Sequence, residues 1–254
     1  SVQSMLHDVA EKERLARELE LAREIQESLL PERTLEMGPV TVRATFQPAA
    51  EVGGDYFDVF PISDERLVVA IGDVAGHGLS TGLLMASLKS SVAALVHEGY
   101  GGSELIEKVN RLVIEQAQAR TMVTLSVIEI DLARDQIVLT NAGHPPAYVI
   151  DTERGLQELL VSSLPVGSRL CGPKSIQHPF ANGCRLLLYS DGLVEAASAS
   201  GEPFGYTRLE RILEKSAQLP GDELTAAILA ALADYTNETP LADDLTVLVV
   251  ERSA

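Results

Sequence analysis

The sequence predicts an α+β fold: two antiparallel sheets stacked between pairs of helices, preceded by a helical linker. Three observations support this. Apolar, strand-like segments follow one another at the short intervals that antiparallel sheets use. Helical segments interrupt them in pairs, in the order strands, two helices, a run of strands, two helices and one strand. The first thirty residues contain neither Gly nor Pro, which indicates one long helix in front of the sheets.

The composition limits the classes of function. With 20 Lys and Arg against 37 Asp and Glu, the formal net charge is −17, which argues against a nucleic-acid partner or an anionic lipid surface and favours divalent cations. Two cysteines, Cys171 and Cys184, are too few for a disulfide framework, so we expect reduced thiols and a cytoplasmic protein. No apolar run approaches 18 residues and no signal-peptide pattern is present, so we expect no membrane segment within this chain. Because the chain opens on Ser1 rather than Met, we expect further domains upstream.

We interpret residues 1–33 as a helical linker and residues 34–254 as the domain that follows it. The 4-3-4-3 spacing of a heptad seam is kept by Leu15, Leu19, Ala22, Gln26 and Leu29. Two heptads are short, so two alternatives stay open: a helix that lies on its own domain, and a coiled coil that dimerises the chain or transmits a signal. Pro31 ends the helix in both cases.

The first half of the domain is predicted to contain three strands and two helices. Residues 40–47 alternate roughly in polarity, residues 55–60 form an aromatic strand after a Gly pair, and residues 66–72 form an apolar strand. The helix at residues 80–97 is apolar around much of its circumference, so we expect it to be deeply buried. A Gly-rich segment separates it from a helix at residues 103–118, and we expect the two helices to pack antiparallel.

The second half is predicted to be a run of strands, two helices and a last strand. Apolar segments bounded by turn residues predict strands at residues 122–130, 136–141, 147–150, 156–160, 175–180 and 185–189. Helices are expected at residues 207–217 and 222–235, and the last strand follows Asp243 and Asp244. The turn Asn-Ala-Gly-His-Pro-Pro contains His144, a candidate ligand or acid; a lone turn histidine is more often structural or exposed.

Four turns carry an acidic residue at the beginning or end of an apolar strand. A Gly pair precedes Asp55, three glycines surround Asp73, a Gly follows Asp191, and Asp243 is followed by Asp244. Taken singly, each is better explained as a glycine-shaped bend, a hairpin or a solvated turn. In stacked sheets the strand ends can converge, and carboxylates gathered there repel one another unless cations neutralise them.

Mg²⁺ or Mn²⁺ fits such a cluster. These hard cations take oxygen ligands and keep several waters, whereas five scattered His and two Cys offer no obvious zinc site. Two such ions about 3.5 to 4 Å apart hold a bridging water, lower its pKa and stabilise charge on the attacking and leaving oxygens of a phosphoryl group. The predicted chemistry is phosphoester hydrolysis without a protein nucleophile.

Five motifs in this order carry a resemblance to a known family. They are Gly-Gly-Asp-Tyr-Phe-Asp (53–58), Gly-Asp-Val-Ala-Gly-His-Gly (72–78), Asn-Ala-Gly-His-Pro-Pro (141–146), Ser-Asp-Gly (190–192) and Asp-Asp-Leu-Thr (243–246). Together they resemble the metal-dependent PPM serine/threonine phosphatases, in the branch of the bacterial stage II sporulation protein E and the sigma-factor regulator phosphatases. The likeness covers about residues 20–252 and implies a four-layer α-β-β-α sandwich.

The resemblance assigns roles to particular residues. It implies that two Mn²⁺ or Mg²⁺ ions are held by Asp55, Asp73, the backbone carbonyl of Val74, Asp191 and Asp243. Asp244 is the less favoured member of its pair.

Gly76 and His77 are candidate substrate contacts. His77 stands where many members of the branch have Lys, and if it holds the substrate phosphate, activity becomes sensitive to pH near neutrality, because an unperturbed imidazole titrates at about 6.5. No phosphate-binding Arg is placed by a motif.

The function implied by the resemblance is that of a protein serine/threonine phosphatase, in which a metal-bridging water attacks phosphoserine or phosphothreonine. The implied substrate is a phosphorylated bacterial regulatory protein, in particular an anti-sigma-factor antagonist. The segment Ile-Gln-Glu-Ser-Leu-Leu-Pro is similar to the linker that joins a sensor or partner-binding module to the phosphatase in this branch. It favours the coiled-coil alternative, a homodimer, and an upstream sensor domain or activator.

Two rival functions remain. The first is a catalytically silent phosphatase-fold module that binds a partner in a signalling pathway, although all four expected aspartate ligands are present. The second is a carboxylate-metal nuclease, against which the net charge argues.

Overall fold

The computed structural model describes residues 2–50, 52–76, 78–116, 121–237 and 239–253. The helices are α1 (Val2–Leu29), α2 (Leu79–His97), α3 (Gly102–Gln116), α4 (Asp191–Glu195), α5 (Tyr206–Lys215) and α6 (Gly221–Thr236). The strands are β1 (Thr34–Met37), β2 (Val40–Gln47), β3 (Asp55–Ser63), β4 (Arg66–Val74), β5 (Val123–Asp131), β6 (Gln136–Ala142), β7 (Ala147–Asp151), β8 (Gly155–Leu159), β9 (Lys174–Pro179), β10 (Arg185–Tyr189) and β11 (Leu245–Arg252).

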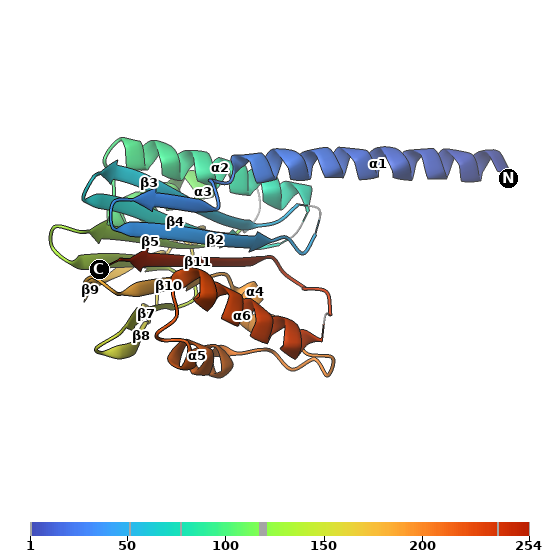
Figure 1. Cartoon of the computed structure of the whole chain (residues 1–254). Coiled ribbons are helices and arrows are strands. Elements are labelled where there is room, and N and C mark those ends of the chain that lie inside the picture. The colour runs from blue at the N-terminus through green and yellow to red at the C-terminus, as the bar shows by residue number, and fades with distance from the viewer. Residues whose placement is uncertain (1, 51, 77, 117–120, 238, 254) are drawn as a thin grey trace.

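The strands form two antiparallel sheets with helices outside them. Sheet A has the order β1-β2-β11-β10-β7-β8, and sheet B has the order β3-β4-β5-β6-β9. Helices α2 and α3 cover the outer side of sheet B, and α5 and α6 cover that of sheet A (Figure 1). The predicted α+β class and the four-layer α-β-β-α sandwich are confirmed.

Three apolar clusters hold the layers together. The central cluster lies between the sheets and includes Phe57, Ile71 and Ile128 from sheet B and Val42, Leu186 and Leu248 from sheet A. A second cluster joins sheet B to α2 and α3, and a third joins sheet A to α5 and α6. Because side chains alternate along a strand, β4 supplies one row to the central cluster and one to the layer of α2 and α3, and β11 does the same for the layer of α5 and α6.

The structure corrects several boundaries. Strand β1 was not predicted; it is a four-residue edge strand that pairs with β2. Strand β4 continues to Val74, so Asp73 lies inside a strand and not in the turn after it. A short helix, α4, begins at Asp191. The end of the helix expected at residues 103–118 falls partly outside the described residues, and its described part ends at Gln116.

The prediction that the second helix is deeply buried is wrong for its first turns. In α2, Leu79 is 50% and Leu83 is 66% exposed, whereas Leu88 and Val92 are buried against sheet B. By length and composition alone, α2 is also the one helix among the described residues that could cross a membrane. Its packing makes it a core helix of the sandwich, because one face is buried on the sheet.

Helix α1 runs away from the domain, and its C-terminal part meets α2 (Figure 1). Within the heptad seam Leu15 is 47% exposed, Leu19 and Ala22 are half-buried, and Gln26 is buried. The part near Gln26 therefore lies on its own domain, as one of the two alternatives predicts. The coiled coil and the dimer stay predictions.

The packing of α2 predicts that Leu→Ala lowers the free energy of unfolding by different amounts at a buried and at an exposed position of this helix. Leu88→Ala removes a buried side chain and leaves a cavity, so we expect it to lower the free energy of unfolding by about 2–5 kcal/mol. Leu83→Ala on the exposed side of the same helix should change it by no more than about 0.5 kcal/mol. Urea unfolding of both variants measures this, and equal costs would contradict the orientation of the helix.

Candidate metal centre

The inner face of sheet B changes from apolar to acidic at one end. Asp55 begins β3 and lies directly opposite Asp73 of β4 in the antiparallel register. Phe57 and Ile71, two residues further along each strand, belong to the cluster between the sheets. Because residues two apart share a face, both carboxylates also point between the sheets.

Residues at the ends of two strands of sheet A also lie at this acidic end of the sandwich. The hydroxyl of Thr246 in β11 donates a 2.5 Å hydrogen bond to Oδ2 of Asp55, which links the two sheets. The Ser190 hydroxyl, at the end of β10, donates to the carbonyl of Asp244 at 3.1 Å and accepts the Thr246 N–H at 2.9 Å. The ends of β10 and β11 are thereby fixed next to Asp55.

Asp191 and Asp243 come together from α4 and from the segment before β11. Gly192 shows how close the two segments are, because a Cβ at this position would lie 2.0 Å from the carbonyl oxygen of Asp244. Burial raises the pKa of Asp191, and the negative charge of Asp243 raises it further. Oδ1 of Asp191 is buried without a hydrogen-bond partner. A buried carboxylate oxygen with no donor is suited to a cation.

The two pairs of aspartates share one electrostatic environment. The pKa of Asp73 is raised to about 7. Burial is the largest cause, followed by the negative charges of Asp191, Asp243, Asp244 and Glu195. The negative charges of α4 and of the segment before β11 thus act on the carboxyl of Asp73 in β4.

The carboxyl of Asp55 is almost completely buried. Burial raises its pKa well above the usual range, and the hydroxyls of Thr246 and Ser190 act in the opposite direction. Asp73 and Asp244 add negative charge and raise the pKa further. Without a neutralising cation, this end of the sandwich therefore favours protonated carboxyls.

The described residues fit a divalent cation site of an open kind. No three of their His, Cys, Asp and Glu side chains are arranged to hold a cation by themselves. Mg²⁺ and similar ions need only one or two carboxylates and complete their shell with waters, so each aspartate pair fits such an ion. The carbonyl oxygen of Val74 lies next to Gly54, the residue before Asp55, since a Cβ on Gly54 would be 2.5 Å from it. The ligand set Asp55, Asp73, Val74, Asp191 and Asp243 stays a prediction.

Asp244 has a structural role, unlike its neighbour Asp243, which is predicted to be a metal ligand. It is 3% exposed, its Oδ1 accepts the N–H of Ala49 at 2.8 Å, and its Oδ2 accepts the N–H of Gly54 at 2.7 Å. A Cβ on Gly53 would lie 1.9 Å from Oδ2, which explains the first Gly of the pair before Asp55. Asp244 therefore anchors the backbone that leads into β3.

Sequence reasoning missed the contact that α1 makes here. The Gln26 side chain donates from Nε2 to the carbonyl of Gly53 at 2.6 Å and accepts the Gly53 N–H at Oε1 at 2.9 Å. Gly53 lies two residues before Asp55. The signal in the sequence was a polar residue within an apolar heptad seam, and the buried amide satisfies both of its polar atoms with one backbone unit.

His144 is held as a neutral side chain. Thr124 accepts the N–H of Asp73 at 3.1 Å, and its hydroxyl lies 2.9 Å from Nδ1 of His144. Burial lowers the pKa of His144 to about 3. His144 thus follows the structural alternative: it connects the turn of residues 141–146 to the strand that carries Asp73.

Gly76, one of the two candidate substrate contacts, lies in the loop between β4 and α2. Gly76 has φ of 117° and Gly78 has φ of 89°, a backbone conformation that glycine adopts at little cost. His77 lies outside the described residues, so its role stays a prediction.

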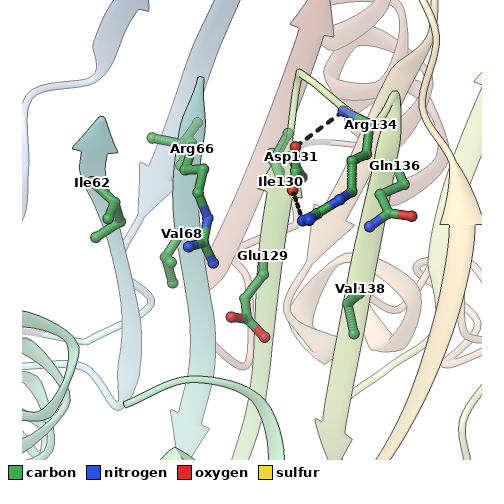
Figure 2. A pocket seen from close by; sticks show the side chains of 10 residues that line it. Ile62, Arg66, Val68, Glu129, Ile130, Asp131, Arg134, Gln136 and Val138 are labelled. Atoms are coloured by element: carbon green, nitrogen blue, oxygen red, sulfur yellow. Dashed lines mark hydrogen bonds and ion pairs between the residues drawn. The ribbon is translucent and has the colours of Figure 1, made fainter. Parts of the chain in front are cut away.

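One cavity lies away from the acidic end of the sandwich. A cavity of about 130 Å³ on the outer side of sheet B is lined by Arg66, Glu129 and Arg134, among others, and contains the ion pair between Arg134 and Asp131 (Figure 2). Arg66 is the first residue of β4 and Asp73 is near its end. At about 3.3 Å per residue, the cavity lies roughly 20 Å from the aspartates.

The raised pKa of Asp73 predicts how the stability of the metal-free protein depends on pH. The carboxyl holds its proton up to about pH 7 when folded and only to about 3.8 when unfolded. The folded state binds more protons in this window, so stability falls as the pH rises from about 4 to 7. Asp73→Asn should remove part of this fall. Thermal unfolding with a chelator at pH 4 and pH 8 measures it.

The control for this prediction is Asp64→Asn, a change of the same kind in the exposed turn after β3. It should leave the pH dependence as in the unchanged chain. If the Asp73→Asn variant shows the same loss of stability between pH 4 and pH 8 as the unchanged chain, the buried, coupled environment of Asp73 is contradicted.

Comparisons with known proteins agree with this geometry. Residues 63–253 match the family described as stage II sporulation protein E (SpoIIE). The chain is 30% identical over 241 residues to phosphoserine phosphatase RsbP of Bacillus subtilis (strain 168), covering 92% of this chain and 58% of that protein. It is 25% identical over 237 residues to phosphoserine phosphatase RsbU of the same organism, covering 92% and 70%. The chain thus spans between about half and three quarters of these relatives.

Solved structures show the same fold. The SiaA-PP2C domain of Pseudomonas aeruginosa superimposes with a TM-score of 0.85 and 25% identity, covering 95% of this chain and 98% of that one. RsbX in complex with magnesium has a TM-score of 0.67 and 18% identity, covering 87% and 98%. Phosphatases of the PP2C family are metal-dependent, in keeping with the acidic end of the sandwich. The chain belongs to the stage II sporulation protein E (SpoIIE) family of PP2C-type phosphatase domains.

Proposed function

We propose that this chain is a protein serine/threonine phosphatase that depends on two Mn²⁺ or Mg²⁺ ions. The observation that carries the proposal is the position of Asp55 opposite Asp73, with Asp191 and Asp243 in the same electrostatic environment. Buried carboxylates of like charge are tolerated where cations neutralise them. The names of the relatives RsbP and RsbU, both phosphoserine phosphatases, support the same reaction.

The chemistry divides between the ions and the chain. When bound, divalent cations lower the pKa of water and stabilise charge on phosphoryl oxygens. Asp55, Asp73, Asp191, Asp243 and the Val74 carbonyl would hold them. Thr246 fixes the orientation of the Asp55 carboxylate, and Thr124 holds the backbone of Asp73. The aspartates act as ligands, so hydrolysis proceeds without a covalent bond to the protein.

The proposed substrate is a phosphorylated regulatory protein of bacteria, with an anti-sigma-factor antagonist as the first candidate. A further solved structure that is similar to this chain, that of the RsbU and RsbW domains of Rv1364c from Mycobacterium tuberculosis, supports this candidate. We also propose that the protein acts in the cytoplasm as a homodimer, and that a sensor domain or activator controls it through α1. The extension of α1 beyond the domain supports the proposed control through this helix (Figure 1).

Phosphate release with and without metal tests the reaction. The purified chain should hydrolyse 4-nitrophenyl phosphate and a phosphoserine peptide with Mn²⁺, and a chelator should abolish the activity. Asp73→Asn should lower kcat by about 100-fold or more, because it removes a ligand of the proposed ions. Equal rates for Asp73→Asn and the unchanged chain would rule out this site. Inactivity of the metal-loaded dimer would favour the catalytically silent module.

The contact of Gln26 with Gly53 predicts that α1 affects metal affinity. Gln26→Leu has a similar size but loses both hydrogen bonds to the segment before Asp55. We expect the Mn²⁺ concentration for half-maximal activity to rise about tenfold, since two buried hydrogen bonds are removed. Glu24→Leu, the same new side chain on an exposed position of α1, is the control. Equal Mn²⁺ dependence in both variants would show that the contact does not position the site.

A further inference from the structure

A cleft opens next to the candidate metal centre on the side of Asp191. Its volume is about 350 Å³, and Asp191 is one of the residues that line it. Glu195 lines the same cleft one helical turn later in α4, on the same side of the helix. When the phosphate of a substrate lies at the aspartates, this cleft is therefore in a position to accept a neighbouring side chain of the same substrate.

The walls of the cleft combine apolar surface with negative charge. Leu160 and Pro145 supply apolar surface, and Tyr206 adds an aromatic ring. Leu160 is 62% and Tyr206 is 45% exposed, so both are accessible to a ligand. Such walls suit a side chain with a long apolar stem, because the stem packs while its head stays near the polar groups.

Positive charge is absent from the described residues that line this cleft. Burial raises the pKa of the Tyr206 phenol, and the negative charges of Glu195, Asp191 and Glu158 raise it further. A cation in the cleft would meet the Glu195 carboxylate and the Tyr206 ring, and both attract it. An acidic side chain in the same place would be repelled.

We propose that this cleft is a specificity subsite for a Lys or Arg side chain of the phosphoprotein substrate, with Glu195 and Tyr206 as its determinants. The inference rests on the proposed phosphatase function. The Cβ atoms of Asp191 and Glu195 are about 6 Å apart on one helix face, and an extended peptide rises about 3.3 Å per residue. The basic residue therefore lies within about three positions of the phosphorylated Ser or Thr.

A peptide series tests the subsite. A neutral phosphoserine peptide is compared with variants that carry one Arg or one Glu at each of the three positions before and after the phosphoserine. For the unchanged chain with Mn²⁺, we expect Arg at one position to raise kcat/KM about fivefold, as for one partly exposed ion pair with an aromatic contact. The rate with 4-nitrophenyl phosphate, which has no flanking residues, normalises each protein variant.

Protein variants identify the determinants. Glu195→Gln should remove most of the preference for Arg, Glu195→Lys should reverse it in favour of Glu, and Tyr206→Leu should weaken it. Glu223→Lys makes the same charge change at an exposed position of α6, far from the cleft, and should keep the preference. If all peptides react equally, or if Glu195→Lys keeps the preference for Arg, the subsite is refuted.

The test separates the subsite from the phosphatase function itself. Hydrolysis of 4-nitrophenyl phosphate without any peptide preference refutes the subsite alone. If no substrate is hydrolysed, the proposed function fails, and binding of the same labelled peptides is then measured by fluorescence anisotropy. Tighter binding of the Arg peptide that Glu195→Lys abolishes supports the subsite, and equal binding of all peptides refutes it.

Discussion

The constraint on which the site depends is the repulsion between Asp55 and Asp73. Like charges directly opposite each other on neighbouring strands destabilise a sheet, and burial raises the cost because the charges leave water. The fold maintains this arrangement through the apolar cluster between the sheets, which fixes the register of β3 and β4 over nearly their whole length. The register that buries Phe57 and Ile71 also brings the two carboxylates together, so the stability of the core and the geometry of the site have the same origin.

The end of the sandwich is assembled from segments that are distant in the chain. Gln26 binds Gly53, Asp244 binds Gly54, and Thr246 binds Asp55, so three successive residues are held by two distant segments, the end of α1 and the start of β11. The glycines are required because the Asp244 carboxylate and the Val74 carbonyl occupy the space of a Cβ. The segment before β3 is therefore defined by contacts and not by its own backbone preference. A displacement of any of the three partners reaches Asp55 directly.

Much of the fold was predictable because it follows from local patterns. The alternation in β2, the apolar runs of the central strands and the order of helix pairs predicted the sandwich, and the four aspartate motifs marked the acidic end. Other features depend on partners that spacing does not identify. Asp244 is buried because of backbone donors about 190 residues away, and Gln26 because of Gly53. The exposed side of α2 was not predictable, since an all-round apolar helix does not reveal which side its neighbours cover.

Helix α1 is a long arm that projects from the domain (Figure 1). It is uninterrupted from Val2 to Leu29, and at 1.5 Å per residue it is about 40 Å long. Each residue turns the helix by about 100°, so a torsion equivalent to a single residue would carry the Gln26 amide off Gly53. A rotation of α1 about its axis by about 100° would therefore break the two hydrogen bonds beside the carboxylates.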